Sequence, residues 1–241
     1  MHATTSPVPG TRFGPEVCVL VPMYNEVTVV GSVIEELLQH FSHVVCVDDG
    51  STDGSSAVAR QAGARVLRHP VNLGAGAAMR TGFEYVLRDP HVQVAVTCDA
   101  DGQHRVVDAV RLAQRALVGD VDVVLGSRFL ADSNTTVPGA RRLLLKAATV
   151  FTRLTTRLDI TDTHNGLRAF GRRAVECTDV TLRGMAHASQ VLAAIPEHGL
   201  SYVEEPVHIA YTEYSLGKGQ RGLNAFNILC DLAVHQMRIA R

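Results

Sequence analysis

The sequence has no marked excess of either basic or acidic residues. Lys and Arg number 23 and Asp and Glu number 24, which leaves a formal net charge of −1. Proteins that bind nucleic acid usually carry a basic surplus. The balance therefore gives no electrostatic case for a nucleic-acid partner.

Cysteine motifs and long hydrophobic runs are also lacking. The five cysteines show no C-x-x-C spacing, so structural disulfides and a cysteine zinc site are not expected, and a reducing cytosol is favoured. No stretch approaches the roughly 20 apolar residues that span a bilayer. The N-terminal MHATTSPVPGTRFGPE has no apolar signal region. We therefore expect a cytoplasmic protein, either soluble or peripheral at the inner face of the cell membrane.

The composition is that of a folded protein with a substantial core. Hydrophobic residues make up 46% and charged residues 20% of the 241 residues, which is typical of a globular chain with one large domain. Residues 1–15 are rich in Pro, Ser, Thr and Gly and predict a flexible leader. We expect the main domain over 16–215, and a basic loop with an amphipathic helix over 216–241.

Apolar runs alternate with helical patterns in the first half of the chain. Strands are expected at 17–22, 44–49, 64–69, 92–99 and 121–127, and helices at 26–41, 56–63, 74–89 and 105–117. Because the strand segments are continuous apolar runs, both faces of the sheet should be covered. The pattern predicts an α/β fold, Rossmann-like, with a mostly parallel central sheet flanked by helices.

Beyond residue 130 the alternation breaks down. A long helix is expected at 138–157, an irregular stretch at 160–172 and a helix near 186–197. A strand near 201–209 and a final helix at 221–239 complete the chain.

Polar residues gather after four of the expected strands. These loops read VPMYNE, DDGSTDGS, CDADGQH and GSRF in chain order. One acidic turn would be an ordinary cap. Ligands of parallel sheets bind beyond the carboxyl ends of the strands, so several acidic loops at one edge predict a ligand site.

The segment DAD carries the strongest chemical signal. Asp99 and Asp101, two residues apart in an extended segment, can turn both carboxylates toward one ion. Gln103 can add an amide oxygen, whereas His104 is left open between ligand and surface residue. Carboxylate and amide oxygens suit Mg²⁺ or Mn²⁺. A metal with few protein ligands usually binds a diphosphate at its open positions.

The segment GAGAAM at 74–79 offers an alternative. It resembles an incomplete G-x-G-x-x-G, follows an expected strand and opens a helix, as in NAD-binding Rossmann proteins. Met79 stands where the third glycine would be, and the unit starts at the third strand. Small residues that let a helix pack closely on the sheet explain the segment equally well.

Taken together, VPMYNE, VDDGSTDGS, NLGAGAAMRTGFE, DADGQH, GSRF and THNGLRAF resemble one family. The chain is similar to family 2 inverting glycosyltransferases of the GT-A fold. The resemblance is to the branch with dolichyl-phosphate mannose synthases and polyprenyl-phosphate glycosyltransferases, and it covers about residues 17–215. It implies a metal-dependent enzyme that moves a sugar from a UDP- or GDP-sugar donor.

The resemblance also implies roles for individual residues. Those that would line the nucleotide pocket are Pro22, Tyr24, Glu26, Asp48, Asp49, Gly74, Arg80 and Asp99. Asp99, Asp101 and Gln103 would hold Mg²⁺ or Mn²⁺ on the donor diphosphate. Asp101, Arg128 and Arg168 would stabilise the leaving nucleoside diphosphate during one inverting displacement.

The acceptor side departs from the family pattern. Many relatives carry an acid on the helix after NGLR, where this chain has Gln190, and an amide cannot act as a base. A sugar hydroxyl acceptor would need a base, such as His187 or Asp162. A polyprenyl phosphate needs none, so it is favoured over a cell-envelope glycan intermediate. Tyr214 and Lys218 are further candidates for this side.

Other interpretations of the chain and of its last helix remain beside the glycosyltransferase. A non-catalytic nucleotide-binding protein of the same fold would keep the pocket and lose the reaction. The apolar stripe of the final helix is typical of a core or homodimer contact, and a membrane-surface role is the other interpretation. A sugar nucleotidyltransferase is disfavoured, because the loop after the first strand is VPMYNE and not a glycine-rich basic loop.

Overall fold

The computed structural model describes residues 10–130, 133, 139–180 and 187–210. Seven strands form one sheet in the order β3-β2-β1-β4-β6-β5-β7. The strands are β1 (Phe13–Met23), β2 (Phe41–Asp48), β3 (Arg65–Arg68), β4 (Val94–Thr97), β5 (Val123–Ser127), β6 (Arg168–Gly171) and β7 (Tyr202–Pro206). The helices are α1 (Val30–His40), α2 (Ser55–Gln61), α3 (Ala75–Leu87), α4 (Val106–Leu117), α5 (Gly139–Thr156), α6 (Arg172–Cys177) and α7 (His187–Glu197).

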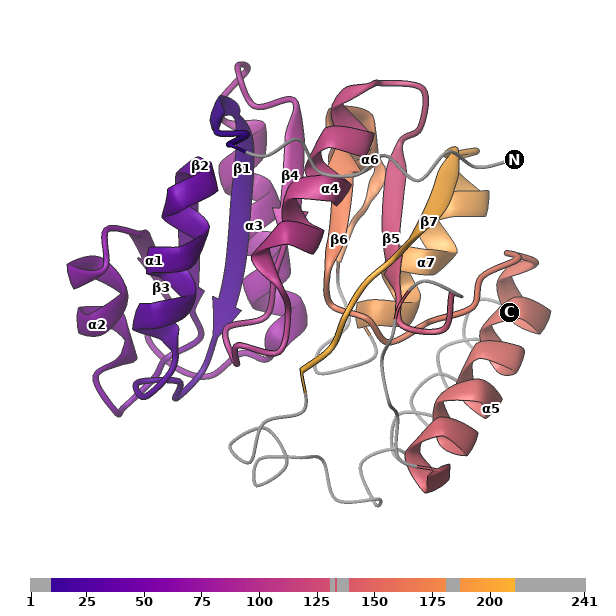
Figure 1. The fold of residues 1–241 in the computed structure, drawn as a ribbon, viewed down its shortest axis with the longest axis horizontal. Coiled ribbons are helices and arrows are strands. Elements are labelled where there is room, and N and C mark those ends of the chain that lie inside the picture. The colour runs from indigo at the N-terminus through magenta and orange to yellow at the C-terminus, as the bar shows by residue number, and fades with distance from the viewer. Residues whose placement is uncertain (1–9, 131–132, 134–138, 181–186, 211–241) are drawn as a thin grey trace.

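Helices cover the sheet on both faces (Figure 1). Buried residues of α1, α2 and α4 form one apolar core with the strands, and buried residues of α3, α6 and α7 form a second core on the opposite face. The buried stripe of α1 is Val30, Val33, Ile34 and Leu37, the spacing of one helical face. The two cores confirm the expectation that continuous apolar strands are buried on both sides.

The sheet is parallel apart from one strand. β6 runs antiparallel to both β4 and β5, with Thr97 opposite Arg168. The sequence predicted an irregular stretch over 160–172; residues 160–167 are irregular, whereas residues 168–171 form β6 and α6 begins at residue 172. The strand is four residues long and begins with an arginine, so its apolar pattern is too short to recognise.

The first helix also begins later than predicted. The expected helix started at residue 26, whereas α1 begins at Val30. The backbone N–H of Glu26 donates to Oγ of Ser55, the first residue of α2, and that of Val27 donates to Oδ2 of Asp53 in the loop after β2. These side-chain acceptors hold residues 26–29 in a turn, and the helix starts after it.

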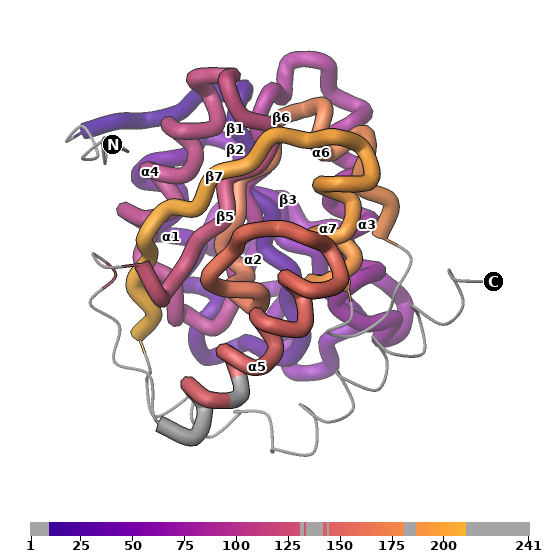
Figure 2. The backbone as a smooth tube through the Cα atoms, turned by 90° about the vertical axis from the view of Figure 1, so that its right-hand side faces the viewer, coloured from indigo at the N-terminus to yellow at the C-terminus, as the bar shows by residue number. Residues whose placement is uncertain are grey.

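One edge of the sheet collects the polar loops. The carboxyl ends of β1, β2 and β4 point the same way because these strands pair in parallel. β5 has the same direction because β6 runs antiparallel to both β4 and β5. Because β6 is antiparallel, its amino end reaches this same edge. Helix α5 lies at the right-hand side of the fold in Figure 1, and it therefore faces the viewer in Figure 2, which is turned by 90°. Among the described residues, no helix is both long and apolar enough to cross a membrane.

Candidate active site

The loops after β1 and β2 hold each other at this edge. The backbone N–H of Asn25 donates to Oγ of Ser51 (2.9 Å), and Oδ1 of Asn25 accepts from the backbone N–H of Thr52 (3.0 Å). Asn25 has a positive φ of 54°, which asparagine tolerates better than most residues. The edge carries three residues expected to bind the nucleotide: Pro22, Tyr24 and Glu26.

Asp48 is buried and shapes the loop after β2. Its Oδ1 accepts from the backbone N–H of Ser51 at 2.9 Å, and its Oδ2 lies 3.4 Å from Nε of Arg68. The hydroxyl of Ser56 donates to the same Oδ2. Both carboxylate oxygens therefore have partners within the protein.

Asp49 ties the glycine-rich loop to the end of β2. Its Oδ2 accepts from the backbone N–H of Gly74 (2.7 Å), and its Oδ1 accepts from the N–H of Leu73 (2.9 Å) and from Nδ1 of His69 (2.8 Å). Gly74 has a φ of 96°, which favours glycine, and α3 begins at the next residue. Arg80, further along α3, is half-exposed.

The DADGQH segment turns sharply after β4. Oδ1 of Asp101 accepts from the backbone N–H of Gln103 (3.0 Å), and Gly102 between them has a φ of 72°. Nε2 of His104 donates to Oδ2 of Asp99 at 3.0 Å. The His104 side chain is only 3% exposed, whereas that of Asp99 is 53% exposed. A buried imidazole thus orients a carboxylate that remains open to solvent.

The two carboxylates have opposite pKa shifts. Burial raises the pKa of Asp101, and the negative charge of Asp99 raises it further. Partial desolvation acts to raise the pKa of Asp99, but the hydrogen bond and charge of His104, with the charges of His187 and Arg168, outweigh it and lower that pKa. Carboxylates that repel each other in this way are stabilised together by a bound cation.

The segment before β6 lies directly against Asp99. Oγ1 of Thr97 donates to the carbonyl oxygen of Gly166 at 2.7 Å. A Cβ atom added at Gly166 would lie 2.5 Å from Oδ1 and 2.7 Å from Cγ of Asp99. Glycine is therefore the residue that lets the carboxylate occupy its place.

Arg168 is buried at the start of β6. It is 4% exposed, and its guanidinium donates to the carbonyl oxygens of Asn165 (3.0 Å), Thr163 (2.9 Å) and Ala188 (3.3 Å). Burial lowers its pKa to about 10. The side chain thus binds two carbonyls of the 160–167 segment and one of α7, and its expected role at the phosphates stays a prediction.

Arg128 is likewise turned into the protein. It is 6% exposed, and its Nε donates to Oδ2 of Asp162 at 2.6 Å. Its Nη2 donates to the carbonyl oxygen of His164 at 3.0 Å. The irregular 160–167 segment has acceptors without strand partners, and the two arginines satisfy them. In the described structure both act on the position of this segment.

The acceptor-side residues are described only in part. His187 begins α7, and its charge contributes to the lowered pKa of Asp99. Gln190 lies one turn further along α7 and is half-buried. Tyr214 and Lys218 lie outside the described residues, as does the helix expected at 221–239.

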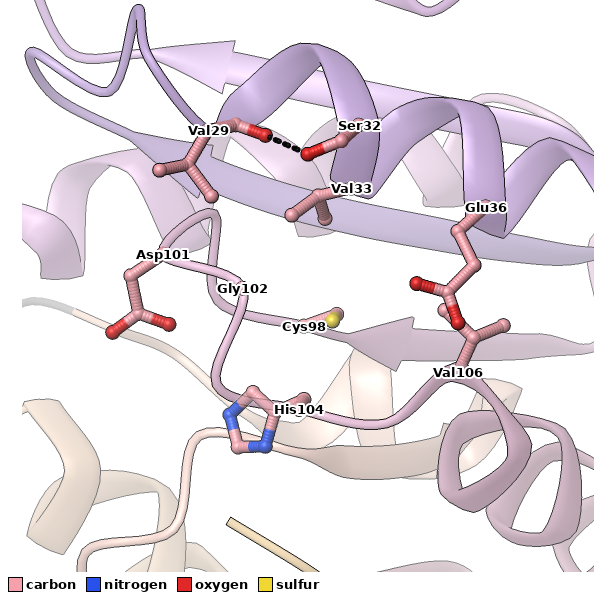
Figure 3. Close-up of a pocket in the computed structure, with 9 residues that line it drawn as sticks. All are labelled: Val29, Ser32, Val33, Glu36, Cys98, Asp101, Gly102, His104 and Val106. Carbon is pink, nitrogen blue, oxygen red and sulfur yellow. Dashed lines mark hydrogen bonds between the residues drawn. The ribbon is translucent and has the colours of Figure 1, made fainter. Parts of the chain in front are cut away.

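A cavity of about 270 Å³ opens between α1 and the DADGQH segment (Figure 3). Figure 3 shows the carboxylates of Asp101 and Glu36 on opposite sides of it. Cys98 also lines the cavity, and burial raises the pKa of its thiol, helped by the charges of Asp99 and Asp101. The Cys98 thiol is therefore a buried group, and Asp101 forms part of the cavity wall.

The donor set suits a hard divalent cation. Within the described ranges, no group of three or more His, Cys, Asp or Glu side chains is arranged to hold a metal by itself. Asp99 and Asp101 provide two carboxylates, and the second is destabilised by the charge of the first. Such a pair fits Mg²⁺ or Mn²⁺ whose other ligands are water and phosphate oxygens.

Comparison with known protein families matches residues 18–178 to glycosyl transferase family 2. The chain belongs to this family. This glycosyltransferase is therefore an enzyme, and the NAD-binding and non-catalytic readings are set aside. The short segment GAGAAM serves in the structure as the start of α3, held by Asp49.

Two curated relatives cover most of the chain. The glycosyltransferase is 32% identical to the polyprenol monophosphomannose synthase of Mycolicibacterium smegmatis, over 83% of this chain and 78% of that protein. It is 26% identical to the UDP-N-acetylglucosamine–dolichyl-phosphate N-acetylglucosaminyltransferase of Methanococcus voltae, over 90% of this chain and 95% of that protein.

A solved structure confirms the fold. Glucosyl-3-phosphoglycerate synthase from Mycobacterium tuberculosis, in complex with Mn²⁺, UDP and glucosyl-3-phosphoglycerate, superimposes with a TM-score of 0.68 at 19% identity. The match covers 90% of this chain and 77% of that chain. The glycosyltransferase therefore has the GT-A fold, as the sequence predicted.

Two contacts at the site were not predicted. Sequence reasoning left His104 open and gave Gly166 no role, yet both touch Asp99. The signal for His104 was its place five residues after Asp99, across a turn. For Gly166 the signal was the glycine itself within THNGLRAF, which becomes informative only once the neighbouring strand is known.

Proposed function

We propose that this glycosyltransferase moves a sugar from a UDP- or GDP-sugar to a polyprenyl phosphate, with inversion and with Mg²⁺ or Mn²⁺. The observation that carries the proposal is the pair Asp99 and Asp101 at the carboxyl edge, beside the loops after β1, β2 and β3. A bound cation would supply charge neutralisation to the donor diphosphate.

The chain's own residues would act by binding and positioning. Asp99, Asp101 and Gln103 would hold the cation, and His104 would keep the Asp99 carboxylate turned toward it. Pro22, Tyr24 and Glu26 would line the nucleotide with the loop that Asp49 anchors at Gly74.

The arginines have two different roles in this proposal. Arg128 and Arg168 hold the segment that contacts Asp99, so we assign them to positioning before any direct phosphate contact. Arg80 is half-exposed on α3, where its Nε lies 3.7 Å from Oε1 of Glu84, and we assign its guanidinium to the nucleotide.

The acceptor is inferred from chemistry and from relatives. Gln190 on α7 cannot take a proton, and a phosphate acceptor is already an oxyanion near neutral pH. Two relatives are named for dolichyl phosphate and for polyprenol monophosphomannose. A cell-envelope glycan is the second candidate acceptor, with His187 as the base that such a hydroxyl would require.

Thermal stabilisation by a panel of UDP- and GDP-sugars, with and without Mn²⁺, tests the donor site. We expect a metal-dependent rise in melting temperature with at least one donor, and its loss in Asp101→Ala. Asp120→Ala is the matched control, because Asp120 pairs with Arg115 at the opposite edge of the sheet. If the rise survives in Asp101→Ala, the metal assignment is wrong.

Incubation of the active donor with polyprenyl phosphate, and separately with soluble glycans, tests the acceptor. We expect a sugar-bearing lipid phosphate product whose anomeric configuration is opposite to that of the donor. Transfer to glycans alone would refute the lipid acceptor.

A further inference from the structure

Helix α5 presents its apolar residues to the outside. Leu143, Val150 and Leu154 are 74%, 56% and 78% exposed. They are seven and four residues apart, which places them on one face of the helix. A globular surface usually carries single exposed apolar residues, whereas this is a continuous stripe.

The opposite face of α5 consists of small and polar residues together with the partly buried Leu145. Ala148, Thr149 and Thr152 are buried there. Oγ1 of Thr149 donates to the carbonyl oxygen of Leu145 at 2.9 Å, so the hydroxyl is satisfied by the helix itself. The outer face of α5 thus exposes large apolar side chains, whereas a helix that packs on a core usually exposes its polar face. Core packing does not account for the outer stripe.

Basic residues flank the stripe. Arg142 and Lys146 are exposed, and the helix sequence GARRLLLKAATVFTRLTT contains no Asp or Glu. Arg153 is exposed on the same flank and pairs with Asp159 just beyond the helix. An apolar stripe bordered by Lys and Arg is the pattern of helices that lie in the headgroup region of anionic bilayers.

The helix is also well placed relative to the active site. It lies on the periphery of the fold in both views (Figures 1 and 2). The chain runs from α5 directly into the segment whose Gly166 contacts Asp99. A partner bound to the outer face of α5 would therefore lie near the segment that borders the donor site.

We propose that the outer face of α5 docks on an anionic lipid bilayer and so brings the active site to a lipid-linked acceptor. The second part rests on the proposed function, whereas the docking does not. A second copy of the chain is a poorer occupant, because two α5 helices packed face to face would bring Arg142 and Lys146 against equal charges.

Cosedimentation of the full chain with vesicles tests the docking. Wild type should bind vesicles of phosphatidylglycerol and phosphatidylcholine, and bind phosphatidylcholine alone much less. The variant Leu143→Gln/Val150→Thr/Leu154→Gln should bind the anionic vesicles at least about tenfold more weakly than wild type. Arg142→Gln/Lys146→Gln should lose most of the preference for anionic vesicles. Val118→Ser, a 70% exposed valine after α4, should bind as wild type.

Several outcomes would overturn the docking. They are no vesicle binding by wild type, equal binding by the triple α5 variant, or a wild-type dimer in sedimentation that the triple variant converts to a monomer. Thermal unfolding of each variant should match wild type, since the changed side chains are exposed.

A water-soluble short-chain polyprenyl phosphate separates docking from function. The triple α5 variant should transfer sugar to this acceptor as wild type does, and lose transfer to long-chain acceptor in vesicles. Vesicle binding without transfer to either acceptor would leave the docking intact and refute the proposed function.

Discussion

Replacement of Gly166 by alanine tests whether the position of Asp99 matters for donor binding. The added Cβ would lie 2.5 Å from Oδ1 and 2.7 Å from Cγ of Asp99, closer than carbon and carboxylate atoms can approach. The backbone of Gly166 is not in the left-handed region, so alanine adds a steric conflict without backbone strain. The carboxylate is the end of a side chain and can rotate away, which breaks its hydrogen bond with His104.

The two expected consequences differ in size. The Asp99 side chain is 53% exposed, so loss of its bond with His104 should lower the free energy of unfolding by only about 1 kcal/mol. That corresponds to about 2–4 °C in melting temperature for a chain of this length. Displacement of the carboxylate proposed to hold the metal should weaken metal-dependent donor binding by about 10–100-fold. Binding should therefore fall much further than stability.

Calorimetric titration of donor with Mn²⁺ and thermal unfolding without ligand measure the two effects separately. Gly171→Ala is the matched control at the other end of β6, because its Cβ would meet the carbonyl oxygen of Asp122 at an ordinary 3.4 Å. Gly166→Ala with donor affinity equal to that of Gly171→Ala would refute the inferred role of Asp99. A melting temperature lowered by more than about 10 °C would show that the segment had rearranged as a whole.

Three further predictions concern buried groups. Asp162→Asn removes the charge that faces Arg128, and the unpaired buried cation should lower the free energy of unfolding by about 3–5 kcal/mol in denaturant titration. Asp49→Asn replaces one carboxylate oxygen by an NH₂ group, which cannot accept a hydrogen bond from a backbone N–H such as that of Gly74. The free energy of unfolding should fall by about 1–3 kcal/mol in the same assay. Burial lowers the pKa of His164 to about 4, below its value near 6.5 in an unfolded chain, so the unfolded state binds the proton first. The contribution of His164 to the free energy of unfolding should be fully present above pH 6.5. Between pH 6.5 and pH 4 the free energy of unfolding should fall by up to about 1.4 kcal/mol per pH unit, and less steeply in His164→Gln.

Much of the fold was predictable because the strands are buried on both faces. Runs such as VCVLVP and VVCVDD remain apolar without alternation, and the structure places them as the adjacent strands β1 and β2. The polar loops that follow were expected to share one edge, and bonds such as that from Asn25 to Ser51 join them there. The charge pair DAD was recognisable because two carboxylates so close together are costly without a counter-charge.

The remaining features depend on partners that are distant in sequence. β6 is only four residues long, and its register is set by β4 and β5, which begin more than 40 residues earlier. The orientation of Arg128 and Arg168 follows from carbonyl and carboxylate acceptors in the 160–167 segment, whose path no local pattern specifies. The length of α5 was predictable, whereas the choice of its inner face was not.

The antiparallel direction of β6 explains why these unpredicted features meet at one place. In a parallel strand, the residues that precede the strand lie at the edge away from the site. β6 is reversed, so the segment before it, which contains Gly166, arrives at the carboxyl edge beside Asp99. Because α5 leads into this segment, the same reversal connects the outward apolar helix to the carboxylate expected to hold the metal.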